Sequence, residues 1–264
     1  MTEYRIVAII PARYDSARFP GKLLADMMGK TVLQRTYENA LQCPLLDHVI
    51  VATDSEKIAL HVREFGGEVI MTSADCPSGS DRIAEAVKNS PELTECEIII
   101  NIQGDEPDLH PSTVEKVIQL LLDDPDANMS TAIIRLNNDE EAQDPSVVKC
   151  VVDEEGYALY FSRALIPHGK TGAFNSETVY YKHIGIYGYR REFLLRFAQL
   201  PQSPLQKAED LEQLKAMEHG YRIKTVEVEH DVIGINTVED LKKKLKELEC
   251  KQNISLSQAE SVHL

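Results

Sequence analysis

The chain has 264 residues, of which 43% are hydrophobic and 27% are charged. This excludes a disordered tail and a miniprotein that depends on disulfides or a metal, because a chain of this length can bury a large core. Its 28 basic and 43 acidic residues give a net charge of -15, which argues against a nucleic-acid partner but leaves room for a local cation cluster that binds a small phosphorylated ligand.

The cysteines and the apolar segments indicate the compartment. Five cysteines form an odd set without a C-x-x-C pair, so the sequence predicts reduced, packing cysteines rather than a disulfide framework or a zinc knuckle. The N-terminal apolar run is too short for a signal peptide, and no stretch approaches the roughly 18 residues of a membrane span. We therefore expect a cytoplasmic protein without membrane insertion.

In the first 108 residues, short β-branched runs alternate with amphipathic stretches. This alternation is typical of parallel strands joined by crossover helices, and the near-continuous apolar runs suit strands covered on both faces. The expected strands are residues 5–10, 48–52, 68–71 and 97–102. The expected helices are residues 32–41, 56–65 and 80–88, and Ser55 and Ser78 are candidate N-terminal caps.

The pattern changes beyond Asp108. Strand-like segments at 147–152, 158–161 and 183–189 predict an antiparallel insertion lobe at about 145–190. Further elements are expected as helices at 191–199, 207–219 and 238–249 and as a strand at 223–229. The fold class is therefore α/β, with a mostly parallel sheet flanked by helices. Residues 1–250 are predicted to form a single domain with this lobe, followed by a polar tail at 251–264.

A basic loop follows the first expected strand. It reads PARYDSARFPGK from Pro11 to Lys22 and contains Arg13, Arg18 and Lys22. Open α/β sheets bind ligands beyond the carboxyl ends of their strands, so Arg13 and Lys22 are candidates to hold a triphosphate. A solvated basic loop is the alternative. The chain has no complete P-loop and no G-x-G-x-x-G after a strand, which disfavours both of those nucleotide-binding classes.

Seven ordered segments extend this observation along most of the chain. They are IIPARYDSARFPGK, ATDSEKI, PSGSDRIAE, NIQGDEP, ALYFSR, KHIGIYGYR and LEQLKAMEHG. Together they resemble the 3-deoxy-manno-octulosonate cytidylyltransferase family, which activates an acidic sugar with CTP. The resemblance implies a Rossmann-like nucleotidyltransferase fold, Mg²⁺ as cofactor, a cytoplasmic homodimer, and a role in lipopolysaccharide precursor synthesis.

The resemblance also implies a metal site. Asp105 follows the strand EIIINI and emerges at the same sheet edge as the basic loop, where its carboxylate can hold Mg²⁺ against substrate phosphates. Glu106 is either part of this site or a surface residue that caps the next helix. The family has a second aspartate late in the chain, and here that position is Asn236. Either metal affinity is weaker, or a nearby acid such as Asp231 or Asp240 compensates.

Substrate contacts are carried over in the same way. The nucleotide-binding residues that the resemblance implies are Ala12, Arg13, Lys22, Pro77, Ser78, Gly79, Arg82 and Gln103. Without the family pattern, Ser78 and its neighbours would be an ordinary helix cap. The implied sugar-binding residues are Gln103, Arg163, His183, Glu209 and Gln213, of which the last two would share a helix face. A structural role is the alternative for His183, and Tyr187 and Tyr189 are expected to pack.

These residues suggest nucleotidyl transfer without a covalent enzyme intermediate. Arg13 and Lys22 would neutralise phosphate charge, and Asp105 would hold Mg²⁺, while no side chain is assigned as general base. Synthesis of a CMP-sialic acid is a rival with the same chemistry. A catalytically silent nucleotide sensor is a rival from another class, suggested by Asn236 in place of a metal ligand.

Overall fold

The computed structural model describes residues 5–16, 18–170 and 172–261, so Ala17 of the basic loop and residues 262–264 of the expected tail lie outside it. Its strands form one sheet, with the order β3-β2-β1-β4-β8-β5-β9 and with β6 and β7 added beside β8. The strands are β1 (Ile6–Ala12), β2 (His48–Thr53), β3 (Glu68–Met71), β4 (Ile98–Asn101), β5 (Met129–Leu136), β6 (Lys149–Val152), β7 (Ala158–Ser162), β8 (Tyr180–Arg190) and β9 (Ile223–Glu227).

The first half of the chain is a parallel unit, as expected. Strand β1 pairs in parallel with both β2 and β4, and β2 pairs in parallel with β3. The crossovers are α1 (Val32–Ala40), α2 (Glu56–Glu64) and α3 (Gly79–Asn89). Ser55 and Ser78 cap α2 and α3 by accepting a backbone N–H, which confirms both predicted caps.

The core lies on both faces of this sheet. Ala8 and Ile10 of β1 belong to one buried cluster, whereas Val7 and Ile9 belong to another on the opposite face. Successive side chains of a strand point to opposite faces, so a strand buried on both faces must be apolar at every position. This requirement explains the unbroken apolar run at the start of the chain.

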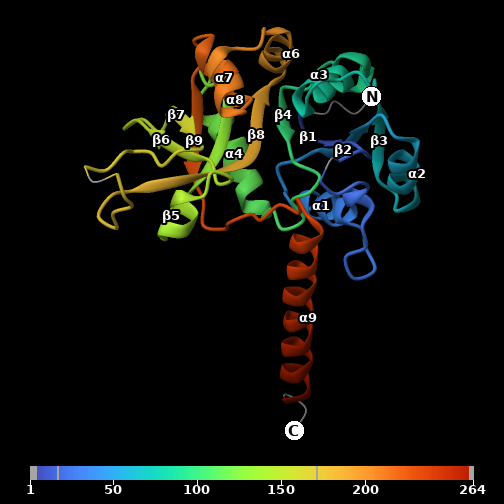
Figure 1. Ribbon diagram of the computed structural model, residues 1–264. Helices are drawn as coiled ribbons and strands as arrows, with labels where there is room; N and C mark the ends of the chain where they lie inside the picture. Colours follow the sequence, from blue (N-terminus) through green and yellow to red (C-terminus); the bar gives the residue numbers. More distant parts are fainter. Residues whose placement is uncertain (1–4, 17, 171, 262–264) are drawn as a thin grey trace.

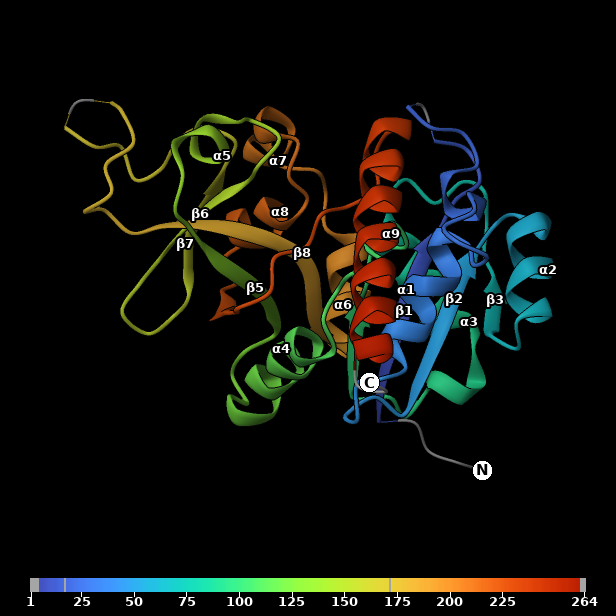
Figure 2. The same ribbon diagram turned by 90° about the horizontal axis from the view of Figure 1, so that it is seen from below.

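Strand β8 joins the two halves. It pairs antiparallel with β4 through its last residues and with β5 along most of its length, and β5 then pairs in parallel with β9. Strands β6, β7 and the first part of β8 form the expected antiparallel lobe, but the second part of β8 lies inside the main sheet. The lobe lies at the end of the molecule opposite α2 and β3 (Figure 2).

Helices cover the second half as well. They are α4 (Pro111–Asp123), α5 (Asp139–Gln143), α6 (Arg191–Gln199), α7 (Pro204–Glu209) and α8 (Gln213–Glu218), and short 3-10 turns occur at Lys22–Leu24 (η1) and Pro91–Leu93 (η2). The single helix expected at 207–219 is wrong. Asp210 has φ of 52°, a left-handed conformation that ends α7 before α8 begins.

The last helix, α9 (Val238–Ser261), continues well beyond its expected end at residue 249. Its C-terminal part projects away from the body of the molecule (Figure 1). Its first turns pack on the loop between β1 and α1, where Leu241 and Leu245 join Met27 and Phe19 in a small apolar cluster. In the described part of the chain, no helix has both the length and the apolar character needed to cross a bilayer.

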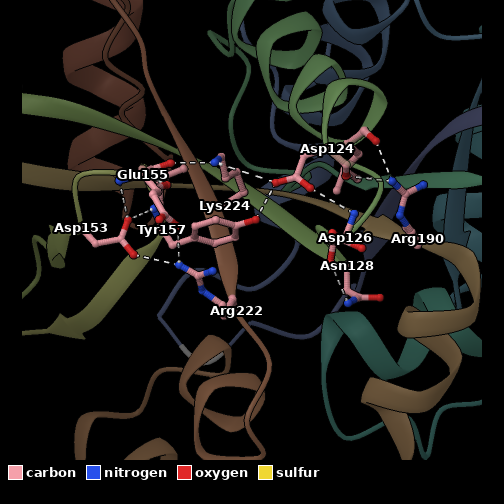
Figure 3. A network of polar contacts seen from close by, with 12 residues as sticks. Asp124, Asp126, Asn128, Asp153, Glu155, Tyr157, Arg190, Arg222 and Lys224 are labelled. Atoms are coloured by element: carbon pink, nitrogen blue, oxygen red, sulfur yellow. Dashed lines mark hydrogen bonds and ion pairs between the residues drawn. The ribbon is translucent and has the colours of Figure 1, made fainter.

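A network of hydrogen bonds and ion pairs connects the turn between β6 and β7 to the rest of the sheet. The Tyr157 hydroxyl donates to Asp124 Oδ2 at 2.5 Å, and its ring lies between the cations of Arg222 and Lys224, which are 3.6 Å and 4.2 Å from the ring centroid (Figure 3). We call this the rear network, comprising Asp124, Asp153, Glu155, Tyr157, Arg190, Arg222 and Lys224. It lies where β5 and β9 begin, which is the edge of the sheet opposite the carboxyl ends of β1 and β4.

Candidate active site

The structure brings Lys22 and Asp105 into contact. Lys22 lies after β1 and Asp105 lies after β4, and these strands are parallel neighbours, so both residues leave the sheet at the same edge. The Lys22 Nζ forms an ion pair with Asp105 Oδ2, and the two side chains are 16% and 20% exposed. The cation and the carboxylate that the sequence singled out separately therefore share one partly enclosed location.

The conformation of the basic loop depends on Gly21. This residue has φ of +72°, which favours glycine, and its N–H donates to the Tyr14 carbonyl oxygen at 3.0 Å. The chain is thereby turned so that Lys22 begins the 3-10 turn η1. On the opposite side Gly104 makes a close approach possible, because a Cβ there would lie 3.3 Å from side-chain atoms of Ile10 and Leu23.

Arg13 connects the basic loop to the turn before α3. Its Nη2 donates to the carbonyl oxygen of Cys76, the residue directly before Pro77. Gly79 at the start of α3 lies against β1, since a Cβ at this position would be 3.3 Å from Pro11 Cγ. The two segments implicated in nucleotide binding are thus adjacent in space as well as in function.

A cleft of about 240 Å³ lies between these segments. Its lining residues are Pro11, Arg13, Asp15, Ser16, Lys22, Leu23, Gly79, Gln103, Gly104 and Asp105. The walls carry two cations and two carboxylates beside backbone of low bulk, which suits a polyphosphate with a metal ion and a flat ring. Five of the predicted site residues, Arg13, Lys22, Gly79, Gln103 and Asp105, therefore meet at one cleft.

Other predicted nucleotide residues surround it. Ala12 ends β1 and is fully buried beside the cleft, so its side chain offers no surface to a ligand. Arg82 on α3 has a side chain with no exposed surface; Nη1 donates to Thr72 Oγ1 at 2.6 Å, but Nε and Nη2 have no hydrogen-bond partner among the described residues. Unsatisfied buried donors are costly, and a polar ligand would satisfy them.

Glu106 is buried rather than a surface helix cap. Its Oε2 has no hydrogen-bond partner within the described chain, and Gly185 of β8 leaves space for the carboxyl, since a Cβ there would lie 3.2 Å from Oε1. Burial raises the pKa of Glu106 to about 8, and the adjacent charge of Asp105 adds to the effect. The helix-capping role weighed for Glu106 is therefore wrong.

The residues considered for the second metal position have other partners. Asn236 Oδ1 accepts from Arg18 Nη2 at 3.0 Å. Asp231 forms an ion pair with Lys182 at 2.7 Å, and Asp240 accepts the N–H groups that open α9. Among the residues that the structure describes, no group of three or more His, Cys, Asp or Glu side chains could hold a metal. Asp105 and Asp15 are the carboxylates that line the cleft.

Four of the five predicted sugar residues lie in the second half, whereas Gln103 lines the cleft. Arg163 and Glu209 are joined by two hydrogen bonds. Glu209 Oε2 accepts from the Arg163 backbone N–H at 2.9 Å, and Arg163 Nε donates to the Glu209 carbonyl oxygen at 2.7 Å. Gln213 is buried on α8, and its Nε2 has no partner in the described structure. Glu209 and Gln213 are on different helices, so the prediction of a shared helix face is wrong.

His183 is enclosed by aromatic side chains. Its ring lies 5.0 Å from that of Phe161 and 5.3 Å from that of Tyr187, between ring centroids, and burial lowers the pKa of His183 to about 3. The Thr131 hydroxyl donates to the Ile186 carbonyl oxygen at 2.7 Å, so it must accept from Nε2–H of His183 at 2.9 Å. The imidazole is therefore neutral, with Nδ1 as its acceptor.

Sequence analysis missed two supporting residues. Lys149 is fully buried on β6 and donates to the carbonyl oxygens of Asp144, Val147 and Arg163 at 2.6–2.8 Å, which fixes the backbone that carries Arg163. A lysine inside an apolar strand was the available signal.

The second is Glu212, which precedes α8. Its two carboxylate oxygens accept from Ser78 Oγ at 2.8 Å and from Ser80 Oγ at 3.0 Å. It thus links the start of α3 to the half of the molecule that holds the predicted sugar residues. Its neighbour Gln213 was selected from the same motif, but spacing alone gave no reason to prefer Glu212.

Comparison with known proteins adds independent information about this arrangement. A family model described as "Cytidylyltransferase" matches residues 7–225. The 3-deoxy-manno-octulosonate cytidylyltransferase of Protochlamydia amoebophila is 52% identical over 252 residues, covering 96% of this chain and 97% of that protein. The protein of the same name from Zea mays is 49% identical and covers 90% of this chain and 79% of its own length.

Solved structures agree. A CMP:2-keto-3-deoxy-manno-octonic acid synthetase complexed with CTP superposes with a TM-score of 0.87 at 42% identity, covering 94% of this chain and 99% of that one. A 4-diphosphocytidyl-2C-methyl-D-erythritol synthase of Anaerococcus prevotii superposes with a TM-score of 0.60 at 15% identity, which reflects a common fold. The fold described above is therefore shared with proteins of known structure.

Proposed function

We propose that this chain, which belongs to the cytidylyltransferase family, couples CTP to 3-deoxy-manno-octulosonate, with formation of the CMP-sugar and release of pyrophosphate. The contact between Lys22 and Asp105 at the carboxyl edge of the sheet carries the proposal. A cation and a carboxylate that could hold a metal ion lie together at one cleft, which supports nucleotidyl transfer. The names of the relatives at 49% and 52% identity support the same substrates.

In this reaction the anomeric hydroxyl of the sugar attacks the α-phosphorus of CTP, and the bond to the β-phosphate oxygen breaks. Lys22 would contact the α-phosphate and Arg13 the outer phosphates, so that charge developing on the leaving pyrophosphate is neutralised. Arg13 is already oriented by the Cys76 carbonyl oxygen. Holding the reactants in line accounts for much of the acceleration in phosphoryl transfers, and these residues can do so without a covalent intermediate.

Asp105 fits a divalent cation. It is one of two carboxylates, with Asp15, that line a cleft able to admit phosphates, and Mg²⁺ is commonly bound by one or two carboxylates, with phosphate and water as the other ligands. Bound there, Mg²⁺ would supply Lewis-acid charge neutralisation on the phosphate oxygens. Lys22 would turn from Asp105 to the nucleotide when the triphosphate arrives. Asn236 fits less well as a second ligand, because its amide oxygen carries no charge and accepts from Arg18.

The cytosine would lie against the turn before α3. Backbone groups of Ala12, Pro77 and Gly79, the Ser78 hydroxyl and the Gln103 amide offer both donors and acceptors, which can distinguish the amino group of cytosine from the carbonyl of uracil. The unsatisfied Nε and Nη2 of Arg82 support a contact with the nucleotide. Cytosine rather than the sugar is therefore assigned to the side of the cleft formed by α3.

The acidic sugar would lie toward the second half. Gln103 lines the cleft and would bridge nucleotide and sugar, while Arg163, Glu209 and Gln213 would bind its carboxylate and hydroxyl groups. Gln213 has an unsatisfied amide and His183 an available Nδ1 acceptor, which support hydroxyl contacts. Arg163 already donates to the carbonyl oxygens of Pro145, Glu209 and Asp210, so its role includes holding this region together.

The wider setting follows from the same family. We include in the proposal a homodimer that acts in the cytoplasm in lipopolysaccharide precursor synthesis. The rival reaction, activation of a nine-carbon sialic acid, would use the same cleft with a different sugar. A silent sensor would bind CTP without chemistry.

One assay separates these possibilities. The purified chain, supplied with CTP and Mg²⁺, is expected to release pyrophosphate when 3-deoxy-manno-octulosonate is added and to do so far more slowly with N-acetylneuraminate. A preference for N-acetylneuraminate would favour the rival substrate. Binding of CTP without pyrophosphate release from either sugar would favour the sensor and contradict the proposal.

A further inference from the structure

The segment that carries Asn236 lies directly beside the proposed metal site. The backbone N–H of Ile235 donates to the carbonyl oxygen of Asp105 at 2.8 Å. A Cβ on Gly234 would lie 3.9 Å from that same oxygen and 3.3 Å from Asn236 Nδ2. Whatever charge is carried at residue 236 is therefore close enough to Asp105 to affect a triphosphate bound there.

The cation found at this location is Arg18, and the Asp240 carboxylate lies on the other side of Asn236. The Arg18 Nη2 donates to Asn236 Oδ1 at 3.0 Å, and the Asn236 backbone N–H donates to Asp240 Oδ2 at 3.0 Å. The amide oxygen is thus used by a guanidinium, and a metal ion bound to the same oxygen would be repelled by that guanidinium. Arg18 belongs to the basic loop that also contains Arg13 and Lys22.

Neither nearby acid is available to compensate. Asp231 is paired with Lys182, and the Asp240 carboxylate accepts the backbone N–H groups of both Asn236 and Thr237 at the start of α9. Using Asp240 as a metal ligand would remove both of those hydrogen bonds, which orient the Asn236 segment.

An amide at residue 236 has a different effect from a carboxylate. A carboxylate hydrogen-bonded to Arg18 would cancel its charge, whereas the amide oxygen orients the guanidinium through one N–H group and leaves its net charge intact. The other donors of Arg18 remain available for phosphate oxygens. With asparagine at position 236, the side chain therefore orients the permanent charge of Arg18 instead of binding a second metal ion.

We propose that Arg18, positioned by Asn236, supplies to the CTP triphosphate the positive charge that a second metal ion would otherwise provide, so that the site takes one divalent cation, on Asp105. The inference rests on the proposed function, because it concerns the same nucleotide. Arg18 is the phosphate-binding residue and Asn236 acts through it as a positioning residue.

Binding of CTP without metal tests the role of Arg18. Isothermal titration with the full chain in EDTA is expected to show CTP binding that Arg18→Ala weakens about tenfold or more, the scale of one charge-assisted hydrogen-bond contact. Asn236→Ala should weaken it by a smaller factor, and the double variant should be no weaker than Arg18→Ala alone, since Asn236 acts through Arg18. Arg63→Ala, which removes an exposed cation on α2, is the matched control and should bind like wild type.

Metal stoichiometry provides a second readout that does not depend on turnover. Electron paramagnetic resonance with Mn²⁺ and CTP is expected to detect one bound ion per chain, in wild type and in Asn236→Ala alike. Two ions in wild type, one of them lost in Asn236→Ala, would overturn the inference, as would wild-type CTP affinity for Arg18→Ala in EDTA.

These outcomes are distinguishable from failure of the proposed function. A chain that binds CTP only in the presence of metal contradicts the role of Arg18 and leaves the cytidylyltransferase activity standing. A chain that binds CTP under neither condition contradicts both. Circular dichroism of each variant checks that the comparison is made between folded proteins.

Discussion

The candidate active site and the rear network are both dense in charge, yet they differ in how completely their polar groups are bonded. In the rear network Tyr157, Asp124, Asp153 and Arg222 all have protein partners (Figure 3). Around the cleft, by contrast, Glu106 and Arg82 have buried atoms without a partner in the described chain. Polar groups whose hydrogen bonds are all made within the protein hold the strands together. Polar groups without a protein partner are left for a substrate to hydrogen-bond.

The two regions also lie at opposite edges of the sheet. The rear network surrounds the beginnings of β5 and β9, while Lys22 and Asp105 follow the ends of β1 and β4. Parallel strands collect their following loops at one edge, which is where function concentrates in such sheets. Substitutions at the cleft should therefore affect chemistry, and those at the rear should affect stability.

The largest effect is expected for Lys22→Ala. Removal of a charge that stabilises the transition state should lower kcat by roughly 10²-fold or more while the chain remains folded. Steady-state pyrophosphate release together with circular dichroism measures this. Lys88→Ala removes an exposed lysine from α3 and should retain near-normal turnover. Near-normal kcat for folded Lys22→Ala would remove Lys22 from the chemistry.

His183 offers a test that depends on pH. Because burial lowers its pKa to about 3, the unfolded chain binds a proton at this residue below about pH 6.5 that the folded chain does not bind until about pH 3. The free energy of unfolding should therefore fall as pH drops through this window, by up to about 1.4 kcal/mol per pH unit from this residue.

The measurement is urea unfolding of wild type and His183→Asn between pH 4 and pH 8. The free energy of unfolding of wild type minus that of His183→Asn should decrease as the pH falls, whatever its value at neutral pH. A difference that is independent of pH would show that His183 is protonated equally in the folded and unfolded chains, and would contradict the buried, neutral imidazole.

Tyr157→Phe sharpens the contrast at the rear. Loss of the hydroxyl that donates to Asp124 should lower the free energy of unfolding by about 1–2 kcal/mol, because the acceptor is charged. Turnover and the KM for CTP should not change. The control is Leu159→Ala, which changes an exposed side chain of β7. Tyr187→Phe is unsuitable as a control because Tyr187 contacts His183. A tenfold loss of turnover in Tyr157→Phe would mean that the two regions are coupled.

The smallest effect is expected for Arg222→Ala. Arg222 forms ion pairs with Asp153 and Glu155, and because the side chains of Arg222 and Glu155 are 57% and 71% exposed, these pairs should contribute little to stability. Its position over the Tyr157 ring adds a similarly small amount. Thermal denaturation of Arg222→Ala and wild type in low and high salt would measure the combined contribution of the ion pairs and the ring contact. A loss of stability larger than that of Tyr157→Phe would contradict this ranking.

The parallel half of the fold could be predicted from sequence almost residue by residue. Strands β1 to β4 and helices α1 to α3 lie within two residues of their expected bounds. A strand buried on both faces needs a continuous apolar run, and a capped amphipathic helix has its own period, so both signals are local. The contact between Lys22 and Asp105 followed from the same logic, since the ends of parallel strands share an edge.

The second half could not be predicted as well, because its determinants are not local. Helix α4 and strand β5 were not expected at all, although β5 lies inside the sheet. Ser130 and Thr131 interrupt its apolar pattern, and both are buried because their hydroxyls bond to the carbonyl oxygens of Val117 and Ile186. Likewise the left-handed Asp210 divides α7 from α8 at a position that sequence periodicity treats as helical.

Glu212 has a consequence for hybrid enzymes assembled from pieces of related chains. The base-binding turn and the sugar-binding region come from distant parts of the sequence, but one carboxylate fastens the two serines at the start of α3. A hybrid that takes its first hundred residues from one parent and its remainder from another preserves this fastening when Ser78, Ser80 and Glu212 are inherited together. A hybrid that separates these three residues is expected to lose the hydrogen bonds that join the start of α3 to the second half of the chain.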